Sequence, residues 1–217
     1  MTPSTSSGVE SRAAPLSPTA PVVFVVDDDI SVRESLELML RYAGWRVVTF
    51  SSAQEFLAHP RVHLPSCLIL DVHLPDLNGL DLQNRIGAHS AEMPIIFITG
   101  YGDVPMTVRA MKAGALEFLT KPFNDDVLLE AVRSAIERSR AALGREAQLS
   151  TLRDEYSTLS RREREVMALV VSGRPNKQIG AELGISEITV KAHRGRVMRK
   201  MNAGSLADLV HIAAQLD

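Results

Sequence analysis

The chain has 217 residues, of which 45% are hydrophobic and 23% are charged, the ordinary composition of a soluble protein with a hydrophobic core. No apolar run approaches the ~18 residues that a membrane span needs, and a single cysteine excludes an intrachain disulfide and a Cys-rich zinc site. The N-terminus has no apolar segment of the kind found in secretory signals. Together these features predict a cytoplasmic protein without membrane contact.

The net charge of −2 hides two unlike parts of the chain. Residues 22–137 carry 9 basic and 16 acidic side chains, a net charge of −7. Residues 138–217 carry 14 basic and 9 acidic side chains, a net charge of +5. This asymmetry predicts an acidic module joined to a module that meets a polyanion.

Strands and helices alternate along the first part of the chain. Residues 1–20 are rich in Ser, Thr, Pro and Ala without periodicity, which predicts a disordered tail. Apolar runs rich in β-branched residues then predict strands at 22–26, 45–50, 67–71, 94–99 and 115–119. Helical spacing of apolar residues predicts helices at 31–42, 53–58, 79–87, 104–113 and from 124 into the 130s. The alternation predicts an α/β fold, a doubly wound five-stranded parallel sheet with helices on both faces.

The second part of the chain has only helical patterns. Residues 138–158 are charged, Ala-rich and helix-prone, and they predict a linker that partly continues the preceding helix. Four further helices are predicted near 160–172, 176–183, 186–201 and 205–216, with Gly or Pro at the breaks. The predicted organisation is a tail (1–20), a sheet domain (21–138), a helical linker (139–157) and a small all-α domain (158–217).

Polar side chains follow the carboxyl ends of four predicted strands, the edge at which open parallel sheets bind ligands. Close carboxylates repel unless a cation joins them, and oxygen ligands favour Mg²⁺. One carboxylate is then placed to attack phosphorus and form an aspartyl-phosphate, with an ammonium and a hydroxyl beside it. These side chains are Asp27, Asp28 and Asp29 after the first strand, Asp71 ending the third, Thr99 ending the fourth and Lys121 after the fifth.

A purely structural interpretation exists for each of these residues taken singly. Asp29 is the expected N-cap of the first helix, and Lys121-Pro122 has the form of an ordinary turn. Their joint occurrence on four of five strands favours a phosphorylation pocket.

The segments VVDDD (25–29), LDVHLPDLNGLDL (70–82), ITGYGD (98–103) and FLTKPF (118–123) resemble the flavodoxin-like receiver domain of bacterial two-component response regulators. The resemblance covers residues 21 to about 140 and implies a cis Lys121-Pro122 bond. It also implies a set of site roles: Asp71 as phosphoacceptor, Asp27, Asp28, Asp71 and the His73 carbonyl as Mg²⁺ ligands, Thr99 and Lys121 as phosphoryl contacts, and Phe118 as the aromatic switch residue.

Phe118 differs from the Tyr common at that position, so the hydroxyl hydrogen bond is lost. Residues 103–123 resemble the FixJ-like subset, in which the fourth helix and fifth strand form a surface that dimerises on phosphorylation. The candidate residues for this surface are Val104, Met106, Val108, Met111 and Leu116, although apolar residues of this helix are also expected in the core.

Residues 176–183, Gly184 and 186–201 have the helix–tight turn–helix pattern of a helix-turn-helix unit. Val190, Val197 and Met201 recur at helical spacing and predict a buried stripe. Residues 191–200 include five basic side chains and no acid, which fits either a face that approaches a DNA major groove and its flanking phosphates or a face that is merely solvated.

The segment LSRREREVMALVVSGRPNKQIGAELGISEITVKAHRGRVMRKM (159–201) resembles the LuxR/NarL/FixJ-type DNA-binding domain throughout. Gly195 departs from the longer side chain common there, which lowers base discrimination or lets the helix sit closer. The last helix (205–216) resembles the dimerisation helix of the family, with Leu206, Leu209 and Val210 as interface or core. The resemblance implies base contacts by Lys191, Ala192 and Gly195, and DNA-backbone contacts by Asn176, Lys177, Thr189, Arg194 and Arg199.

The sequence therefore predicts a phosphorylation-activated transcription regulator rather than an enzyme, apart from self-phosphorylation from donors and slow dephosphorylation. The implied partners are a sensor histidine kinase, double-stranded promoter DNA, a second copy of the chain and RNA polymerase. The alternative is an aspartate-nucleophile phosphohydrolase, which would use the same side chains but needs longer strand-end loops for a substrate cap. A constitutive DNA binder with a degenerate receiver is disfavoured because every position of the acidic pocket is occupied.

Overall fold

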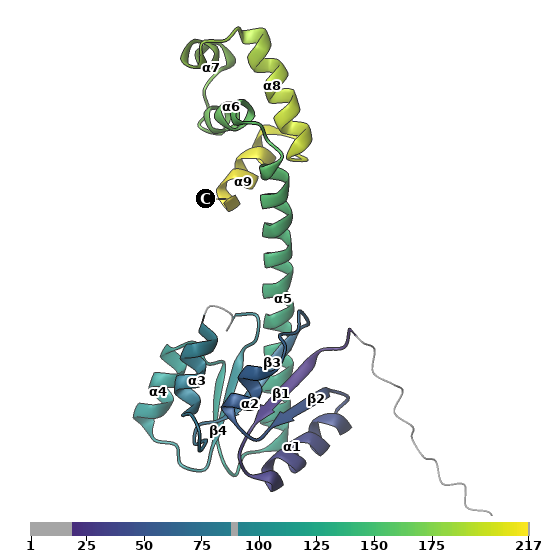
Figure 1. Ribbon diagram of the computed structural model, residues 1–217, viewed down its shortest axis with the longest axis vertical. Helices are drawn as coiled ribbons and strands as arrows, with labels where there is room; N and C mark the ends of the chain where they lie inside the picture. Colours follow the sequence, from purple (N-terminus) through teal and green to yellow (C-terminus); the bar gives the residue numbers. More distant parts are fainter. Residues whose placement is uncertain (1–18, 88–90, 217) are drawn as a thin grey trace, which may run out of the picture. The chain divides into compact units, whose positions relative to one another are not determined.

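The computed structural model describes residues 19–87 and 91–216 (Figure 1). The chain divides into two compact units, of which the first ends at Leu143 and the second begins at Gly144. The predicted tail lies outside the described residues except for Thr19 and Ala20. Among the helices of the described ranges, none is long and apolar enough to cross a membrane.

The first unit is the predicted α/β fold. Its sheet is parallel with the strand order β2-β1-β3-β4-β5, so the order reverses between β1 and β3, where ligands of such sheets bind. The strands are β1 (Val22–Val26), β2 (Arg46–Phe50), β3 (Ser66–Asp71), β4 (Ile95–Thr99) and β5 (Glu117–Thr120). The helices are α1 (Ile30–Tyr42), α2 (Ala53–Ala58), α3 (Gly79–Ile86), α4 (Val104–Lys112) and α5 (Asp125–Ser157).

Two apolar layers sandwich the sheet because successive strand residues point to opposite faces. Phe24 and Leu70 pack in the layer under α2, α3 and α4. Val25 and Ile69, their chain neighbours, pack in the layer under α1 and α5. The helices lie on both faces of the sheet (Figure 1). Because β1 and β3 are buried on both sides, Asp27 and Asp71 at their carboxyl ends are buried as well.

Most element bounds agree with the predicted ones to within one residue, but β5 begins two residues later than predicted. Gly114 lies in the left-handed region (φ +93°), and the Ala115 N–H still bonds to the Ala110 carbonyl of α4. Leu116 then donates to the Ile95 carbonyl at 2.8 Å before the regular strand begins at Glu117. The turn out of α4 therefore uses the apolar residues that had predicted the strand start.

Helix α5 continues through all the residues that the sequence predicted as a linker, up to Ser157. Its first half buries Leu128, Val132 and Ile136 against the sheet. Ser139, also buried, accepts the Ser66 N–H at 2.9 Å and donates to the Glu92 carbonyl. The sequence predicted only a partial continuation, because apolar residues become sparse after this point and helical periodicity fades.

The second unit consists of α6 (Arg161–Val171), α7 (Asn176–Leu183), α8 (Glu187–Lys200) and α9 (Leu206–Leu216), together with the end of α5. Val190, Val197 and Met201 are buried in its core, which confirms the predicted stripe. Gly180 permits the tight turn after α7, because a Cβ there would lie 2.7 Å from the Ile185 carbonyl oxygen. The α7–turn–α8 segment is thus a helix-turn-helix.

Candidate functional site

Three acidic side chains meet at the carboxyl ends of the neighbouring strands β1 and β3. Asp27 follows β1 directly, and Asp71 is the last residue of β3. Carboxylate oxygens of Asp27, Asp28 and Asp71 all lie within 4.8 Å of one another. Asp27 and Asp71 are buried, whereas Asp28 is exposed. The expectation that acidic residues at the carboxyl ends of parallel strands lie close together is therefore confirmed for these three side chains.

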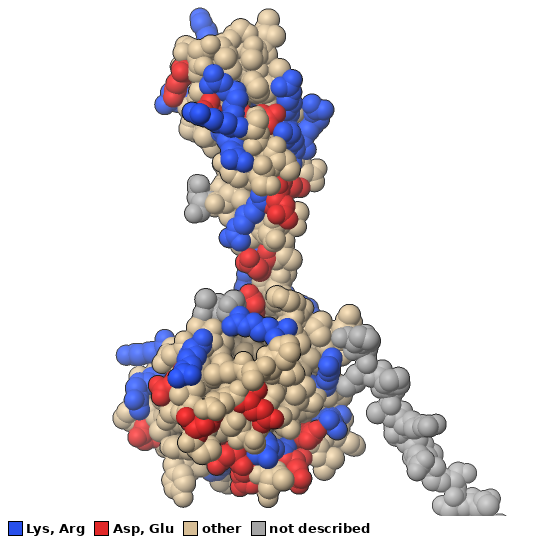
Figure 2. Space-filling view, viewed as in Figure 1, with Lys and Arg blue, Asp and Glu red and all other residues tan. Residues whose placement is uncertain are grey.

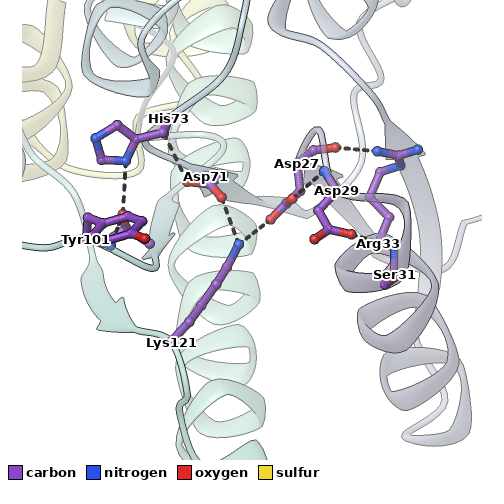
Figure 3. A network of polar contacts seen from close by, with 9 residues as sticks. Asp27, Asp29, Ser31, Arg33, Asp71, His73, Tyr101 and Lys121 are labelled. Carbon is purple, nitrogen blue, oxygen red and sulfur yellow. Dashed lines mark hydrogen bonds and ion pairs between the residues drawn. The ribbon is translucent and has the colours of Figure 1, made fainter.

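The ammonium of Lys121 lies between the two buried carboxylates (Figure 3). Its Nζ is 2.7 Å from Asp27 Oδ2 and 2.7 Å from Asp71 Oδ2. The Lys121 N–H also donates to the Thr99 carbonyl at 2.7 Å, which attaches the chain after β5 to the end of β4. The Lys121-Pro122 peptide bond is cis, as the resemblance implied.

The second oxygen of each buried carboxylate accepts a backbone N–H. Asp29 N–H donates to Asp27 Oδ1 at 2.9 Å, and His73 N–H donates to Asp71 Oδ1 at 2.9 Å (Figure 3). Arg33 on α1 donates to the Asp27 carbonyl at 2.7 Å. In both Asp27 and Asp71, one carboxylate oxygen is thus oriented by a backbone N–H, and the other contacts the Lys121 ammonium that the two residues share.

The pocket holds more carboxylate than its own cation neutralises. Burial raises the pKa of the Asp27 carboxyl, against the opposing effect of Lys121. Burial alone lowers the pKa of Lys121, but its hydrogen bonds to Asp27 and Asp71 outweigh this and raise the pKa above the ordinary value. Since the exposed Asp28 carboxylate adds a third acidic group, the site is compatible with a divalent cation.

Thr99, predicted as a phosphoryl contact, is fully buried at the end of β4. Its Oγ1 accepts the Tyr101 N–H at 3.2 Å and lies 3.2 Å from His73 Nδ1. The His73 ring also contacts the Tyr101 ring edge-on, with 6.5 Å between centroids. Sequence reasoning missed this role of the His73 side chain, because only its carbonyl was considered.

The ring of Phe118 is half-buried on the sheet face that carries α4. Its centroid lies 6.0 Å from that of Phe97, and a Cβ at Gly102 would approach the Phe118 ring to 3.0 Å. Met106 and Leu116 pack against the two core layers. The exposed apolar surface of α4 therefore reduces to Val104 (76% exposed), Val108 and Met111.

In the helical unit, the predicted DNA-facing residues of α8 are exposed opposite its buried stripe. They are Lys191, Ala192, Gly195 and Arg199. Figure 2 shows Lys and Arg side chains gathered over this unit. Lys191 Nζ lies 3.0 Å from the Glu187 carboxylate one turn earlier. On α9, Leu209 is core, whereas Leu206 and Val210 are exposed.

Of the predicted DNA-backbone contacts, Asn176, Lys177 and Thr189 lie in the first turns of α7 and α8, whereas Arg199 lies in the last turn of α8. Arg194 donates to the Asn176 side-chain oxygen at 3.3 Å, which joins α8 to the first residue of α7. Lys177 is exposed beside Asn176. The Thr189 hydroxyl lies 2.8 Å from that of Ser186, the N-cap of α8, so it already has a partner.

One of the five basic side chains counted on the sequence does not belong to this face. Lys200 Nζ donates at 2.8 Å both to the Thr158 carbonyl and to the carboxylate of Glu163. Glu163, 4% exposed, also closes a capping box with Ser160 at the start of α6. Lys200 therefore joins the end of α8 to α6, a long-range pairing that sequence spacing does not reveal.

The ion pair of Lys200 with the buried Glu163 makes the helical unit sensitive to acid. The Lys200 hydrogen bond and the Ser160 N–H lower the pKa of Glu163 to about 2. Since the unfolded chain binds the proton near pH 4.5, the stabilisation is complete above that pH and is lost as pH falls toward 2. At pH 7, Lys200→Met is expected to lower the free energy of unfolding by about 1–3 kcal/mol.

Urea unfolding followed by NMR resonances of α6 and α8 measures this effect between pH 7 and pH 2. Lys191→Met is the matched control, because its ion pair with Glu187 is exposed and contributes little. Equal unfolding curves for the two variants would contradict the assigned role of Lys200.

Comparison with known proteins decides the family. Residues 23–133 match the family described as response regulator receiver domain. The chain belongs to the response regulators. Residues 157–213 match the family described as bacterial regulatory proteins, luxR family. A response regulator with this second domain is a phosphorylation-dependent, DNA-binding transcription regulator, and its receiver domain implies a histidine kinase partner.

Relatives of this response regulator match over nearly their whole length. Nodulation protein W of Bradyrhizobium diazoefficiens is 52% identical over 198 residues, which are 91% of this chain and 87% of that protein. Transcriptional regulatory protein FixJ of Rhizobium meliloti is 44% identical over 191 residues, 88% of this chain and 94% of that protein. The solved structure of response regulator StyR has a TM-score of 0.78 at 49% identity, covering 90% of this chain and 99% of StyR. None of these likenesses favours a phosphohydrolase.

Proposed function

We propose that this response regulator accepts a phosphoryl group on Asp71 from a sensor histidine kinase and then binds promoter DNA as a dimer. The Lys121 ammonium carries the proposal, because it lies 2.7 Å from carboxylate oxygens of both Asp71 and Asp27. A phosphoryl group on Asp71 brings new anionic oxygens to a place where a cation is already held. Lys121 then pairs with them as a point charge.

The transfer forms one bond and breaks one. A carboxylate oxygen of Asp71 bonds to phosphorus while the bond from phosphorus to the donor histidine nitrogen breaks, and the nitrogen keeps the electron pair. The Thr99 hydroxyl leaves its contact with His73 and donates to a phosphoryl oxygen. Beyond accepting this group and slowly losing it to water, the protein has no proposed catalytic activity.

Mg²⁺ is the proposed cofactor because the donor set consists of hard oxygen ligands. Asp27, Asp28 and Asp71 have oxygens within 4.8 Å of one another, and the backbone carbonyl of His73 is the further proposed ligand. When bound, the ion supplies positive charge that neutralises the phosphoryl oxygens.

Asp28→Ala is expected to weaken Mg²⁺ binding at least tenfold, because loss of groups that merely support metal ligands already costs about 10–100-fold. Isothermal titration calorimetry measures the affinity directly. Asp29→Asn is the matched control: it removes a neighbouring charge but keeps the N-cap of α1, where Asp29 accepts the Ser31 N–H at 2.8 Å. Equal affinities for the Asp28 variant and the control would remove Asp28 from the ligand set.

The proposed DNA interface is the exposed face of α8 together with the start of α7. The basic charge of this part of the chain supports it, since phosphate contacts supply much of the affinity for DNA. The proposed DNA-backbone contacts are Asn176, Lys177, Thr189, Arg194 and Arg199, and the proposed base-facing residues are Lys191, Ala192 and Gly195.

Lys191→Ala is expected to weaken binding to the selected site about 10- to 100-fold and to relax selectivity at one base pair, as loss of a base contact does. Lys177→Ala is the contrast, because loss of a phosphate contact weakens binding to all sequences and lowers its salt dependence. Fluorescence anisotropy at several salt concentrations distinguishes the two patterns. An unchanged base preference in the Lys191 variant would contradict a base contact.

The proposed dimer uses the exposed apolar residues of α4, Val104, Val108 and Met111, with Leu206 and Val210 of α9 as a second contact. RNA polymerase is the proposed further partner at the promoter. The proposed location is the cytoplasm, because that is where a bacterial regulator reaches the chromosome and its kinase.

Selection of genomic DNA fragments with and without acetyl phosphate and Mg²⁺ tests the whole proposal. The wild-type chain is expected to enrich a defined set of promoters only with the donor, whereas Asp71→Asn enriches none above its background. Equal enrichment with and without the phosphodonor would favour a constitutive DNA binder. Repeated release of phosphate from the donor would favour a phosphohydrolase.

A further inference from the structure

Ile188, the second residue of α8, is 80% exposed. A single exposed apolar side chain is ordinary on a protein surface, so exposure alone assigns it nothing. Its position on the helix is informative, because it lies on the face that the proposed function assigns to DNA.

The spacing along α8 places Ile188 opposite the core stripe. Residues 188, 192, 195 and 199 follow one another at intervals of four, three and four, which keeps them on one face of a helix. Val190, Val197 and Met201 occupy the buried face. Ile188 therefore heads the outward row that continues through Ala192, Gly195 and Arg199.

The neighbours of Ile188 in this row leave room for a close partner. Ala192 is small and exposed, and a Cβ at Gly195 would meet nothing within 4 Å. Lys191, a proposed base contact, lies beside this row rather than in it, with its Nζ 3.0 Å from the carboxylate of Glu187. Ile188, Ala192 and Gly195 therefore present apolar side chains and exposed backbone to the groove, and none of their side chains carries a hydrogen-bond donor.

Only one feature of the major groove matches a branched apolar side chain. Base edges there present donors and acceptors except at thymine, whose 5-methyl group is apolar. N-terminal residues of a recognition helix are the ones that reach base edges in helix-turn-helix proteins. We infer that Ile188 is a specificity-determining residue that contacts the 5-methyl group of one thymine in each half-site, an inference that rests on the proposed function.

The test removes the methyl group from the DNA and the side chain from the protein separately. The full chain, phosphorylated with acetyl phosphate and Mg²⁺, first selects its site from random duplexes. Each thymine of that site is then replaced singly by deoxyuridine, which lacks only the methyl group. For wild type, one position per half-site is expected to lose about fourfold in affinity, the equivalent of about 0.8 kcal/mol for one buried methyl group.

Ile188→Ala is expected to bind the thymine and deoxyuridine sites equally, about as weakly as wild type binds the deoxyuridine site. Ile188→Val keeps branched methyl groups and is expected to retain the discrimination. Leu38→Ala, a change at another exposed apolar residue (74% exposed, on α1), is the matched control and is expected to behave as wild type.

The inference is overturned if no thymine replacement weakens wild-type binding, or if the loss persists undiminished in Ile188→Ala. Either result leaves phosphorylation-dependent site selection intact, so it does not affect the proposed function. Failure to select any duplex would instead overturn the proposed function and the inference with it.

Discussion

Replacing Asp71 by Asn is expected to abolish labelling of the protein by a radioactive small phosphodonor. The Asn amide oxygen is a poor nucleophile. Asp27, the other carboxylate that contacts Lys121, is fully buried, whereas the side chain of Asp71 is 9% exposed and can meet a donor. Its Oδ1 is held by the His73 N–H, and its Oδ2 lies 2.7 Å from the Lys121 ammonium. The wild-type label is expected to be an acyl phosphate, which hydroxylamine removes.

The fold is expected to survive this substitution, because Lys121 keeps its ion pair with Asp27 and Asn fills the same volume. Circular dichroism checks this point. Asp76→Asn is the matched control: Asp76 is exposed after β3 and accepts the N–H groups of Ala53 and Gln54 at the start of α2. Labelling of Asp71→Asn at the wild-type level would show that another residue accepts the phosphoryl group.

The fold was predictable from the sequence because the apolar runs are short, separate and buried on both faces. β1 and β3 consist entirely of buried residues, so their ends and the acids after them were evident without coordinates. The parallel arrangement then brings these ends to one edge, and it is the topology that places Asp27 beside Asp71. Similarly, Asp29 was identified as the N-cap of α1 from a local pattern.

Pairings between distant side chains were not predictable. The contact of His73 with Thr99 and that of Lys200 with Glu163 join residues from different elements, and no spacing rule relates them. The start of β5 was predicted too early because the turn after α4 contains apolar residues of the kind that also form strands. Local periodicity reports which face of an element is buried, but it does not report which polar atoms face each other across elements.

The pocket and the surface of α4 are linked by the strands β4 and β5. Thr99 ends β4, pairs with Thr120 in the strand register and is bonded through its carbonyl to the Lys121 N–H. Phe118 lies two residues before Thr120, on the sheet face that carries α4. The proposed movement of the Thr99 hydroxyl toward a phosphoryl group would therefore act on the same strands that support Phe118 and α4.

Phosphorylation is expected to shift the protein from monomer to dimer and to tighten its binding to a pseudo-palindromic site. A phosphoryl group on Asp71 carries about two negative charges in place of the single charge of the carboxylate, and Lys121 and Thr99 meet them by small movements. Such a change is a sufficient switch if one arrangement of α4 and β5 dimerises better than the other. Two recognition helices held together raise the affinity for paired half-sites through effective concentration, by about 10²–10⁴-fold over one contact.

Analytical ultracentrifugation with and without acetyl phosphate measures the shift, and DNA titration at fixed salt measures its consequence. Val104→Glu places a charge in the exposed apolar surface of α4, so it is expected to prevent dimerisation while Asp71 is still labelled. Leu38→Glu, on the exposed side of α1, is the matched control and is expected to dimerise. A fully phosphorylated protein that stays monomeric and binds DNA no more tightly than before would refute the mechanism. Phosphorylation of Asp71 would then have no effect on DNA binding, and dimerisation at α4 could not connect the two.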